Sequence, residues 1–297
     1  NTGSVAQRLA DTPGVARTIL DAARAARGMA GADPRAMSHS WLFTGPPGSG
    51  RSLAALDFAA ALMCTDPEEP GCGRCEACQA VLGAKQHTDL VLVDPQEVII
   101  PVDTVREVIG RAASLPTVAP WRVVIFNNAD RLTNNGANAL LKTVEEPPAR
   151  TVIIMCAPSD APEDFSQTLR SRCRHLYIPS PSVESITAQL VSEGASDHDA
   201  HLAALTSLRH VGRARRLVND PAVQKRRAVA INLAEEVFHG SQGFQAVTSL
   251  LKLVDSEAKE SHKEQEEAEL AKLEQTLGVG AKGKGCLLYT SDAADDM

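Results

Sequence analysis

The sequence predicts an α/β fold in which the strands form a largely parallel sheet and are followed by helices. Between residues 41 and 178, short apolar runs alternate with helix-like segments. Because these runs are apolar throughout, they are typical of strands buried on both faces of a parallel sheet. After Pro179 the strand-like runs stop while helical periodicity continues. The pattern therefore predicts a sheet-containing region followed by a purely helical one.

Each expected element follows from local composition. An Ala-rich periodic stretch predicts a helix over 15–26, and similar periodicity predicts helices over 53–62 and 138–146, the second of which is stopped by Pro147 and Pro148. Helical periodicity returns at 186–190, 202–205, 213–217 and 229–254. The expected strands are 41–44, 90–93, 122–126, 151–155 and 175–178.

Changes in composition mark the expected domain boundaries. We expect an α/β domain over 1–178 with a cysteine-rich insertion at 64–78, a helical domain over 179–227, and a further helical region over 228–285. The acidic stretch 255–274 predicts a solvated helix. Residues 286–297 resemble a translated sequencing adapter and are interpreted as a non-native tail, with a short natural tail as the alternative. Because the chain begins at Asn1 and soon enters a helix, we expect preceding residues to be missing.

Charge and composition limit the classes of partner. The 297 residues contain 30 Lys and Arg against 37 Asp and Glu, so the net charge of −7 repels a nucleic-acid backbone. Aromatic residues make up only 3%, too few for the stacking platforms of single-strand binders. No apolar run approaches the roughly 18 to 20 residues of a membrane span, and no signal segment opens the chain. A cytoplasmic location is therefore expected.

A phosphate-loop motif stands directly after the first expected strand. Residues 45–52, G-P-P-G-S-G-R-S, match the pattern G-x-x-x-x-G-K-[ST] except at Arg51. Gly45, Gly48 and Gly50 would let backbone N–H groups approach phosphates, and the Ser52 hydroxyl would meet Mg²⁺. The Arg51 guanidinium is bulkier than the usual lysine and differently directed. The sequence leaves two alternatives, weak binding of ATP or ADP and a structural turn that binds nothing.

The second half of such a nucleotide site also departs from the active pattern. An ATPase of this class needs an acidic residue after a neighbouring strand to hold Mg²⁺. Here the strand 122–126 is followed by Asn127 and Asn128, whose amides carry no charge, and Asp130 comes too late to replace them. Two defects in separate halves of the site predict a scaffold that does not hydrolyse ATP.

Four cysteines have the spacing of a structural metal site. Cys64, Cys72, Cys75 and Cys78 form a C-x7-C-x2-C-x2-C pattern within 15 residues. Four thiolates this close predict a closed tetrahedral Zn²⁺ site that stabilises an insertion too short to form its own core. The alternative is four buried or unpaired cysteines.

Taken together, the motifs resemble the clamp-loader branch of the AAA+ family. They are the phosphate loop, the four-cysteine insertion, N-A-L-L-K-T-V-E-E-P-P at 138–148 and T-L-R-S-R-C-R at 168–174. The resemblance covers about residues 5 to 240. It implies a RecA-like AAA+ domain, a small helical lid over 179–227 and the truncated start of a helical collar over 228–285 through which the family oligomerises.

The resemblance also implies roles for two arginines. Arg172, in the Ser-Arg-Cys motif, matches the family's arginine finger, which acts in trans at a neighbour's ATP site. Arg215 matches a phosphate-sensing arginine of the lid helix. Ser159 and Asp160 correspond only loosely to the family's nucleotide-sensing polar residue. The implied function is a non-hydrolysing, stator-like subunit that works with the motor subunits gamma or tau and with delta to load a sliding clamp on primed DNA.

Two other functions remain as alternatives. The first is an ATP-hydrolysing motor subunit of the same loader, against which Arg51, Asn127 and Asn128 argue. The second is a zinc-dependent nucleic-acid-binding module, motivated by the cysteines and by a run of basic residues. That run is either a solvated helix face or a surface that contacts primer-template phosphates inside the assembly, and it contains Arg209, Arg213, Arg215, Arg216, Lys225, Arg226 and Arg227.

Overall fold

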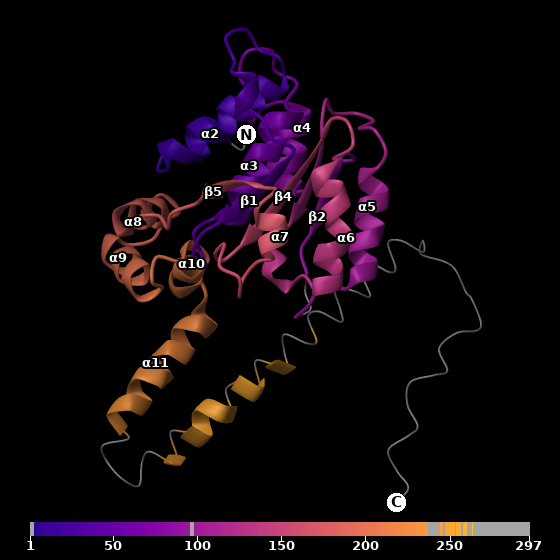
Figure 1. Cartoon of the computed structure of the whole chain (residues 1–297). Coiled ribbons are helices and arrows are strands. Elements are labelled where there is room, and N and C mark those ends of the chain that lie inside the picture. The colour runs from indigo at the N-terminus through magenta and orange to yellow at the C-terminus, as the bar shows by residue number, and fades with distance from the viewer. Residues whose placement is uncertain are drawn as a thin grey trace, which may run out of the picture. The chain divides into compact units, whose positions relative to one another are not determined.

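The computed structural model describes residues 3–95 and 98–236, together with 244–245, 247–252, 254–256, 258–259 and 263 (Figure 1). The chain divides into two compact units, Asn1–Asp220 and Pro221–Met297. The expected boundary at 179 lies inside the first unit and stays a prediction. The expected tail 286–297 and most of the expected acidic helix 255–274 lie outside the described residues.

The first unit is built on a five-stranded parallel sheet with the strand order β2-β3-β4-β1-β5. The strands are β1 (Ser40–Thr44), β2 (Leu90–Val93), β3 (Arg122–Phe126), β4 (Thr151–Ala157) and β5 (Arg174–Tyr177). All five expected strands are confirmed, and β4 runs two residues further than its apolar run predicts. Leu42 of the interior strand β1 lies opposite Met155 on one side and His175 on the other.

Helices cover both faces of this sheet (Figure 1). One face packs on α2, α3 and the η2 turn, and it includes Trp41, Phe43 and Ile154. The opposite face includes Leu42 and Ile153 and packs on α5, α6 and α7. The side chains of successive residues in one strand thus pack into different cores, because side chains alternate between the two faces of a sheet. The result is a three-layer α/β/α arrangement.

The helices of these layers and their connecting turns begin and end at defined residues. Before the edge strand β2 lie α1 (Val5–Arg8), α2 (Pro13–Ala26), η1 (Pro34–Ala36), α3 (Arg51–Met63), α4 (Glu76–Gln79) and η2 (Ala80–Ala84). After it lie α5 (Val102–Ala112), η3 (Ala129–Arg131), α6 (Asn134–Glu145) and α7 (Gln167–Arg170).

The edge strand β5 differs from the expectation of burial on both faces. Arg174 and Tyr177 are exposed, and the two residues between them are half-buried. The Arg174 guanidinium lies 4.9 Å from the ring centroid of Trp41, a cation–π contact that covers the end of the buried strand β1. The apolar run His175–Ile178 predicted the strand correctly but not its place at the sheet edge.

A buried ion pair fixes the start of the other edge strand. Asp89 is fully buried and accepts hydrogen bonds from the backbone N–H groups of Thr117, Val118 and Ala119, each at 2.8 Å. The Arg122 guanidinium lies 3.0 Å from the same carboxylate. Burial acts to raise the pKa of Asp89, but these donors outweigh it and hold the pKa well below its usual range. The carboxylate therefore fixes the loop that leads into β3.

Three helices after β5 have a small core of their own. They are α8 (Val183–Ser192), α9 (Asp197–Thr206) and α10 (Val211–Asn219), and their core includes Ile186, Leu190 and Ala204. In the second unit, α11 spans Pro221–Glu236. Within the described part of the chain, none of the helices combines the length and apolar character that crossing a bilayer requires.

Candidate functional site

A cavity of about 600 Å³ lies beside the phosphate loop, between that loop and the α8–α10 helices. Five sequence-predicted site residues line it: Gly48, Gly50, Arg51, Ser52 and Arg215. The loop reaches this position because β1 ends at the carboxyl edge of the parallel sheet and α3 begins directly after the loop. Ligands of open α/β sheets bind at this edge. The fold thus brings the predicted phosphate loop and the predicted lid arginine to one cavity.

Two glycines of the loop, Gly45 and Gly48, lie where a side chain would overlap neighbouring atoms. Gly48 has φ of 86°, and a Cβ atom there would overlap the ring of His210, which comes from the turn before α10. At Gly45 a Cβ atom would overlap the carbonyl oxygen of Ile178. The loop therefore packs closely against the segment that follows β5 and against the turn before α10.

Arg51 is turned back onto its own loop. Its guanidinium donates a hydrogen bond to the Gly45 carbonyl oxygen. Burial lowers the pKa of Arg51, and this effect is partly offset by Cys156, Asp130 and Asp164. The guanidinium that stands in place of the usual phosphate-binding lysine is thus hydrogen-bonded to its own loop.

The position expected to hold a metal carries an uncharged, buried amide. Asn127 follows β3, and its backbone N–H donates to the Val93 carbonyl oxygen at 2.9 Å. Among the described residues, its side-chain oxygen has no hydrogen-bond partner, and the same is true of the Ser49 hydroxyl in the phosphate loop. Asn128 adopts a left-handed conformation with φ of 52°. Ser49 lines the phosphate-loop cavity, whereas Asn127 and Asn128 are not among its lining residues, and none of the three supplies the carboxylate that Mg²⁺ would need.

Arg215 lines the cavity but is held by its own helical region. Its Nε and Nη2 atoms lie 2.7 and 2.6 Å from the two carboxylate oxygens of Glu193, which follows α8. This hydrogen-bonded pairing raises the pKa of Arg215. A phosphate in the cavity would have to compete with that bidentate ion pair. The phosphate-sensing role of Arg215 stays a prediction.

The sequence did not indicate three further residues that line the same cavity: Arg8, Asp57 and His210. Arg8 of α1 lies 2.5 Å from the Asp57 carboxylate, which is only 2% exposed. Burial raises the pKa of Asp57, and the Arg8 cation offsets part of that effect. One signal was available, because Asp57 is a lone carboxylate in an otherwise apolar helical run.

The two loosely matched polar residues after β4 are engaged locally. The Ser159 hydroxyl donates to the Asp164 carboxylate at 2.6 Å. Asp160 forms an ion pair with Arg170 at 3.0 Å, and this hydrogen-bonded contact lowers the pKa of Asp160. Neither residue is among those that line the cavity at the phosphate loop.

Arg172 lies outside the phosphate-loop cavity of its own chain. It follows α7, its side chain is 37% exposed, and its Nε atom lies 2.5 Å from the Glu145 carboxylate at the end of α6. The Ser-Arg-Cys loop thus presents a partly exposed guanidinium on the surface of the first unit. A role in trans stays a prediction.

The four predicted metal ligands come together in space. The sulfur atoms of Cys64, Cys72, Cys75 and Cys78 all lie within 4.8 Å of one another. Ideal tetrahedral Zn²⁺–thiolate geometry separates its sulfurs by roughly 3.8 Å, and those of Cys64 and Cys75 are 3.9 Å apart. A hydrogen bond from Cys78 lowers the pKa of Cys64, which favours its thiolate form. The cluster can therefore hold a metal ion such as Zn²⁺.

The cysteine-rich segment, which was expected to be too short to form a core of its own, packs into the main core of the first unit. Cys64, Cys72 and Cys78 are buried within the main hydrophobic core. The Val5 backbone N–H donates to the Gly71 carbonyl oxygen at 2.8 Å, which joins the segment to α1. The four-cysteine cluster therefore lies where the segment packs against α1 and α3.

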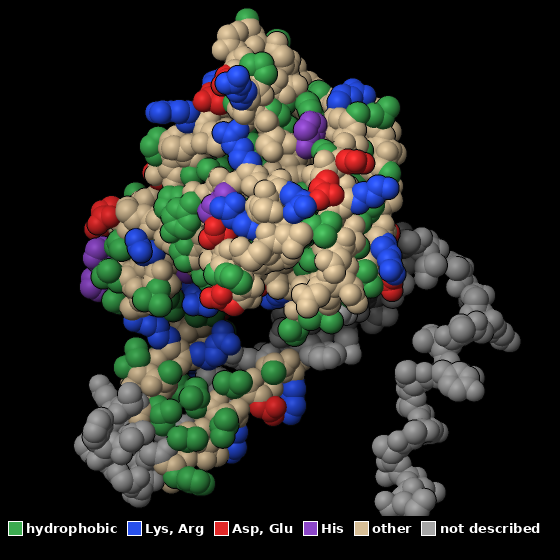
Figure 2. Space-filling model, viewed as in Figure 1, with side chains coloured by type: hydrophobic (Ala, Val, Ile, Leu, Met, Phe, Trp, Pro, Cys, Tyr) green, Lys and Arg blue, Asp and Glu red, His purple; other side chains and the backbone are tan. Residues whose placement is uncertain are grey.

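The predicted run of basic residues is divided between the two units. Arg209, Arg213, Arg215 and Arg216 are exposed in the first unit, whereas Lys225, Arg226 and Arg227 belong to α11 in the second. On the face of the first unit seen in Figure 2, basic and acidic side chains are interspersed. The four exposed arginines are therefore a local feature of the α10 region.

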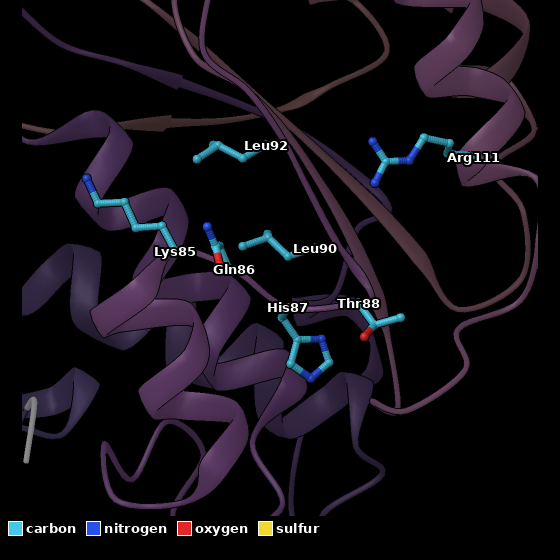
Figure 3. A pocket seen from close by; sticks show the side chains of 7 residues that line it. All are labelled: Lys85, Gln86, His87, Thr88, Leu90, Leu92 and Arg111. Carbon is cyan, nitrogen blue, oxygen red and sulfur yellow. The ribbon is translucent and has the colours of Figure 1, made fainter. Parts of the chain in front are cut away.

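A second hollow, of about 470 Å³, lies at the outer edge of β2. Lys85, His87 and Arg111 surround Leu90 and Leu92 there (Figure 3). None of the sequence-predicted site residues line this hollow, so it is separate from the phosphate-loop cavity.

Comparison with known proteins assigns the family. Residues 30–182, more than half of the chain, match the protein family described as DNA polymerase III, delta subunit. The DNA polymerase III delta' subunit of Pseudomonas aeruginosa is 36% identical over 165 residues, which are 53% of this chain and 49% of that protein. The delta' subunit of Escherichia coli is 35% identical over 170 residues, 56% of this chain and 50% of that protein.

A second kind of relative is also similar. The DNA polymerase III gamma/tau subunit of Mycobacterium tuberculosis is 34% identical over 174 residues, 57% of this chain and 30% of that protein. The chain spans about half the length of the two delta' relatives above. The family match confirms the resemblance that the motifs predicted, and the chain belongs to the DNA polymerase III delta' family, in the clamp-loader branch of the AAA+ proteins.

Proposed function

We propose that this chain is a non-hydrolysing, stator-like subunit of the DNA polymerase III clamp loader. The observation that carries the proposal is the altered nucleotide site, in which Arg51 binds its own loop at Gly45 and Asn127 stands where a carboxylate would hold Mg²⁺. Without that carboxylate the site lacks the charge that binds the metal and stabilises phosphoryl transfer. The proposed loss is that of ATP turnover, and binding of ATP or ADP in the cavity of about 600 Å³ is compatible with it.

The proposed contribution to catalysis is made at a neighbouring subunit. Arg172 is partly exposed and lies outside its own cavity, which supports a guanidinium that reaches a nucleotide bound next door. A forked, permanently charged donor supplied in trans is worth about 10³ to 10⁵ in rate where it is fully used. The proposed partners are the gamma or tau motor subunits, delta, the sliding clamp and primer-template DNA, in the cytoplasm.

Zn²⁺ is the metal we propose for the four-cysteine cluster. Four thiolates with no open position suit a structural ion, and Cys64, Cys72, Cys75 and Cys78 would hold it. The ion would supply no chemistry at the nucleotide site. Its role would be to fix the segment that supports α1 and α3.

Two ATPase measurements test the proposal. The isolated chain should hydrolyse ATP at the background rate with Mg²⁺ present. In a reconstituted loader, Arg172→Ala should lower DNA-stimulated hydrolysis at the adjacent motor site, whereas Arg106→Ala, which removes an exposed arginine of α5, should not. Turnover by the isolated chain, or full activity of the Arg172→Ala loader, would overturn the proposal.

The likeness to a gamma/tau subunit supports a second candidate, an ATP-hydrolysing motor. The first of these measurements separates the two, because a motor would turn over ATP by itself. A zinc-dependent nucleic-acid-binding module is the third possibility, motivated by the cysteine cluster and by Arg209, Arg213 and Arg216. Tight binding of DNA by the isolated chain at physiological salt would favour it, whereas our proposal predicts DNA contact only within the assembled loader.

A further inference from the structure

The Arg172 guanidinium is held by three acceptors of its own chain. Its Nε atom lies 2.5 Å from the Glu145 carboxylate. Its Nη1 atom donates to the Thr168 carbonyl oxygen at 2.9 Å and to the Ser171 hydroxyl at 3.0 Å. These contacts use the single Nε proton and both Nη1 protons. The orientation of the guanidinium plane is therefore fixed before any partner arrives.

The remaining nitrogen is left for an outside acceptor. Within the part of the chain that the structure describes, no hydrogen bond or ion pair engages Nη2 of Arg172. The side chain is 37% exposed, so solvent and a partner can reach it. Two unpaired N–H donors on a fixed, charged plane suit the oxygen atoms of a phosphate.

Glu145 occupies an unusual place for a carboxylate. It is the last residue of α6, where the negative end of the helix dipole disfavours an acidic side chain. Leu140 and Val144 anchor this end of the helix in the core, and Pro147 and Pro148 prevent its continuation. The carboxylate is thus presented at a fixed point, and the Arg172 cation offsets the unfavourable helix dipole.

We propose that Glu145 is the positioning residue for Arg172. Together with Thr168 and Ser171 it holds the guanidinium so that Nη2 faces a phosphate of the nucleotide bound by the neighbouring subunit. This inference rests on the proposed role of Arg172 in trans. Pre-orientation matters because a catalytic donor that must first be ordered loses part of its effect on the transition state.

The test replaces the carboxylate while keeping its shape. In a reconstituted loader whose other motor sites are inactivated, Glu145→Gln should lower kcat at the site next to Arg172 about five- to tenfold, because the charge-assisted hydrogen bond becomes a weaker neutral one. KM for ATP should stay unchanged, since a transition-state interaction is affected. Glu146→Gln is the matched control, because Glu146 is the adjacent exposed carboxylate, and it should leave both constants unchanged.

A double variant separates the inference from the function on which it rests. If Glu145 acts through Arg172, then Glu145→Gln should have no further effect in an Arg172→Ala background. Equal effects of Glu145→Gln in both backgrounds, or unchanged kcat in the single variant while Arg172→Ala is slow, would refute the positioning role and leave the arginine finger standing. If Arg172→Ala itself is fully active, the proposed function fails and the positioning role fails with it.

Discussion

Removal of the metal from the four-cysteine cluster should destabilise the whole first unit and not only the cysteine-rich segment. Cys64 ends α3 directly, and Cys78 is fully buried beside the same helix. The hydrogen bond between Val5 and Gly71 connects the segment to α1. Loss of the metal would therefore loosen α1 and the end of α3 together with residues 64–84.

The size of the effect follows from binding linkage. An ion that binds only the folded state contributes about 4 kcal/mol when its free concentration is 1,000 times its Kd. For a folded unit of this size, each kcal/mol shifts Tm by about 2–4 °C. Removing Zn²⁺ from a solution at that saturation should therefore lower Tm by about 8–16 °C.

The assay combines metal analysis, thermal unfolding and hydrogen exchange. The purified chain should hold one Zn²⁺, and Cys75→Ser should lose it, whereas Cys156→Ala should keep it because that buried thiol lies in β4, outside the cluster. After chelation, amides of residues 3–9 and 51–63 should exchange faster. A Tm change below about 2 °C, or faster exchange confined to 64–84, would contradict the structural argument.

Three further predictions concern single substitutions. Asp89→Asn leaves the buried Arg122 without its carboxylate partner and should lower the free energy of unfolding by about 3–5 kcal/mol, measured in urea titrations. The control Asp103→Asn, on the exposed face of α5, should have little effect. The pKa of Asp89 is lower in the folded state than in the unfolded state. The stabilisation that Asp89 provides is therefore present above its unfolded pKa and is lost as pH falls through its folded pKa. The difference in free energy of unfolding between wild type and Asp89→Asn should accordingly shrink in acid. Gly48→Ala should cost about 1–3 kcal/mol through its positive φ and the overlap with the turn before α10, while Gly14→Ala in α2, where a Cβ meets nothing within 4 Å, should not destabilise. Arg51→Lys should raise ADP affinity about tenfold in calorimetry by removing the competing contact within the loop, without producing ATP turnover.

The sequence predicted the features that depend on neighbouring residues. Continuous apolar runs predicted all five strands, and for β1 to β4 the reason is burial on both faces, which needs no polar alternation. The four-cysteine cluster was predicted because its spacing alone brings the thiols together. The assigned roles of Arg172 and Arg215 stay predictions.

The features that the sequence did not reveal depend on contacts between distant segments. The pairs Arg172–Glu145 and Arg215–Glu193 join residues 27 and 22 positions apart. Long side chains have many possible partners at such separations, and only the fold selects one. The exposure of β5 was missed for the same reason, because the place of a strand in a sheet is not a local property. The packing of the cysteine-rich segment into the main core likewise required the three-dimensional arrangement.

The first helical turn of the chain has a consequence for sensitivity to oxidants. Val5 is bonded to the cysteine-rich segment, and three residues later Arg8 is paired with Asp57 in the wall of the phosphate-loop cavity. Oxidation of the thiols would expel a bound ion and shift the segment on which this turn rests. Such oxidation would thereby change the geometry of the cavity wall.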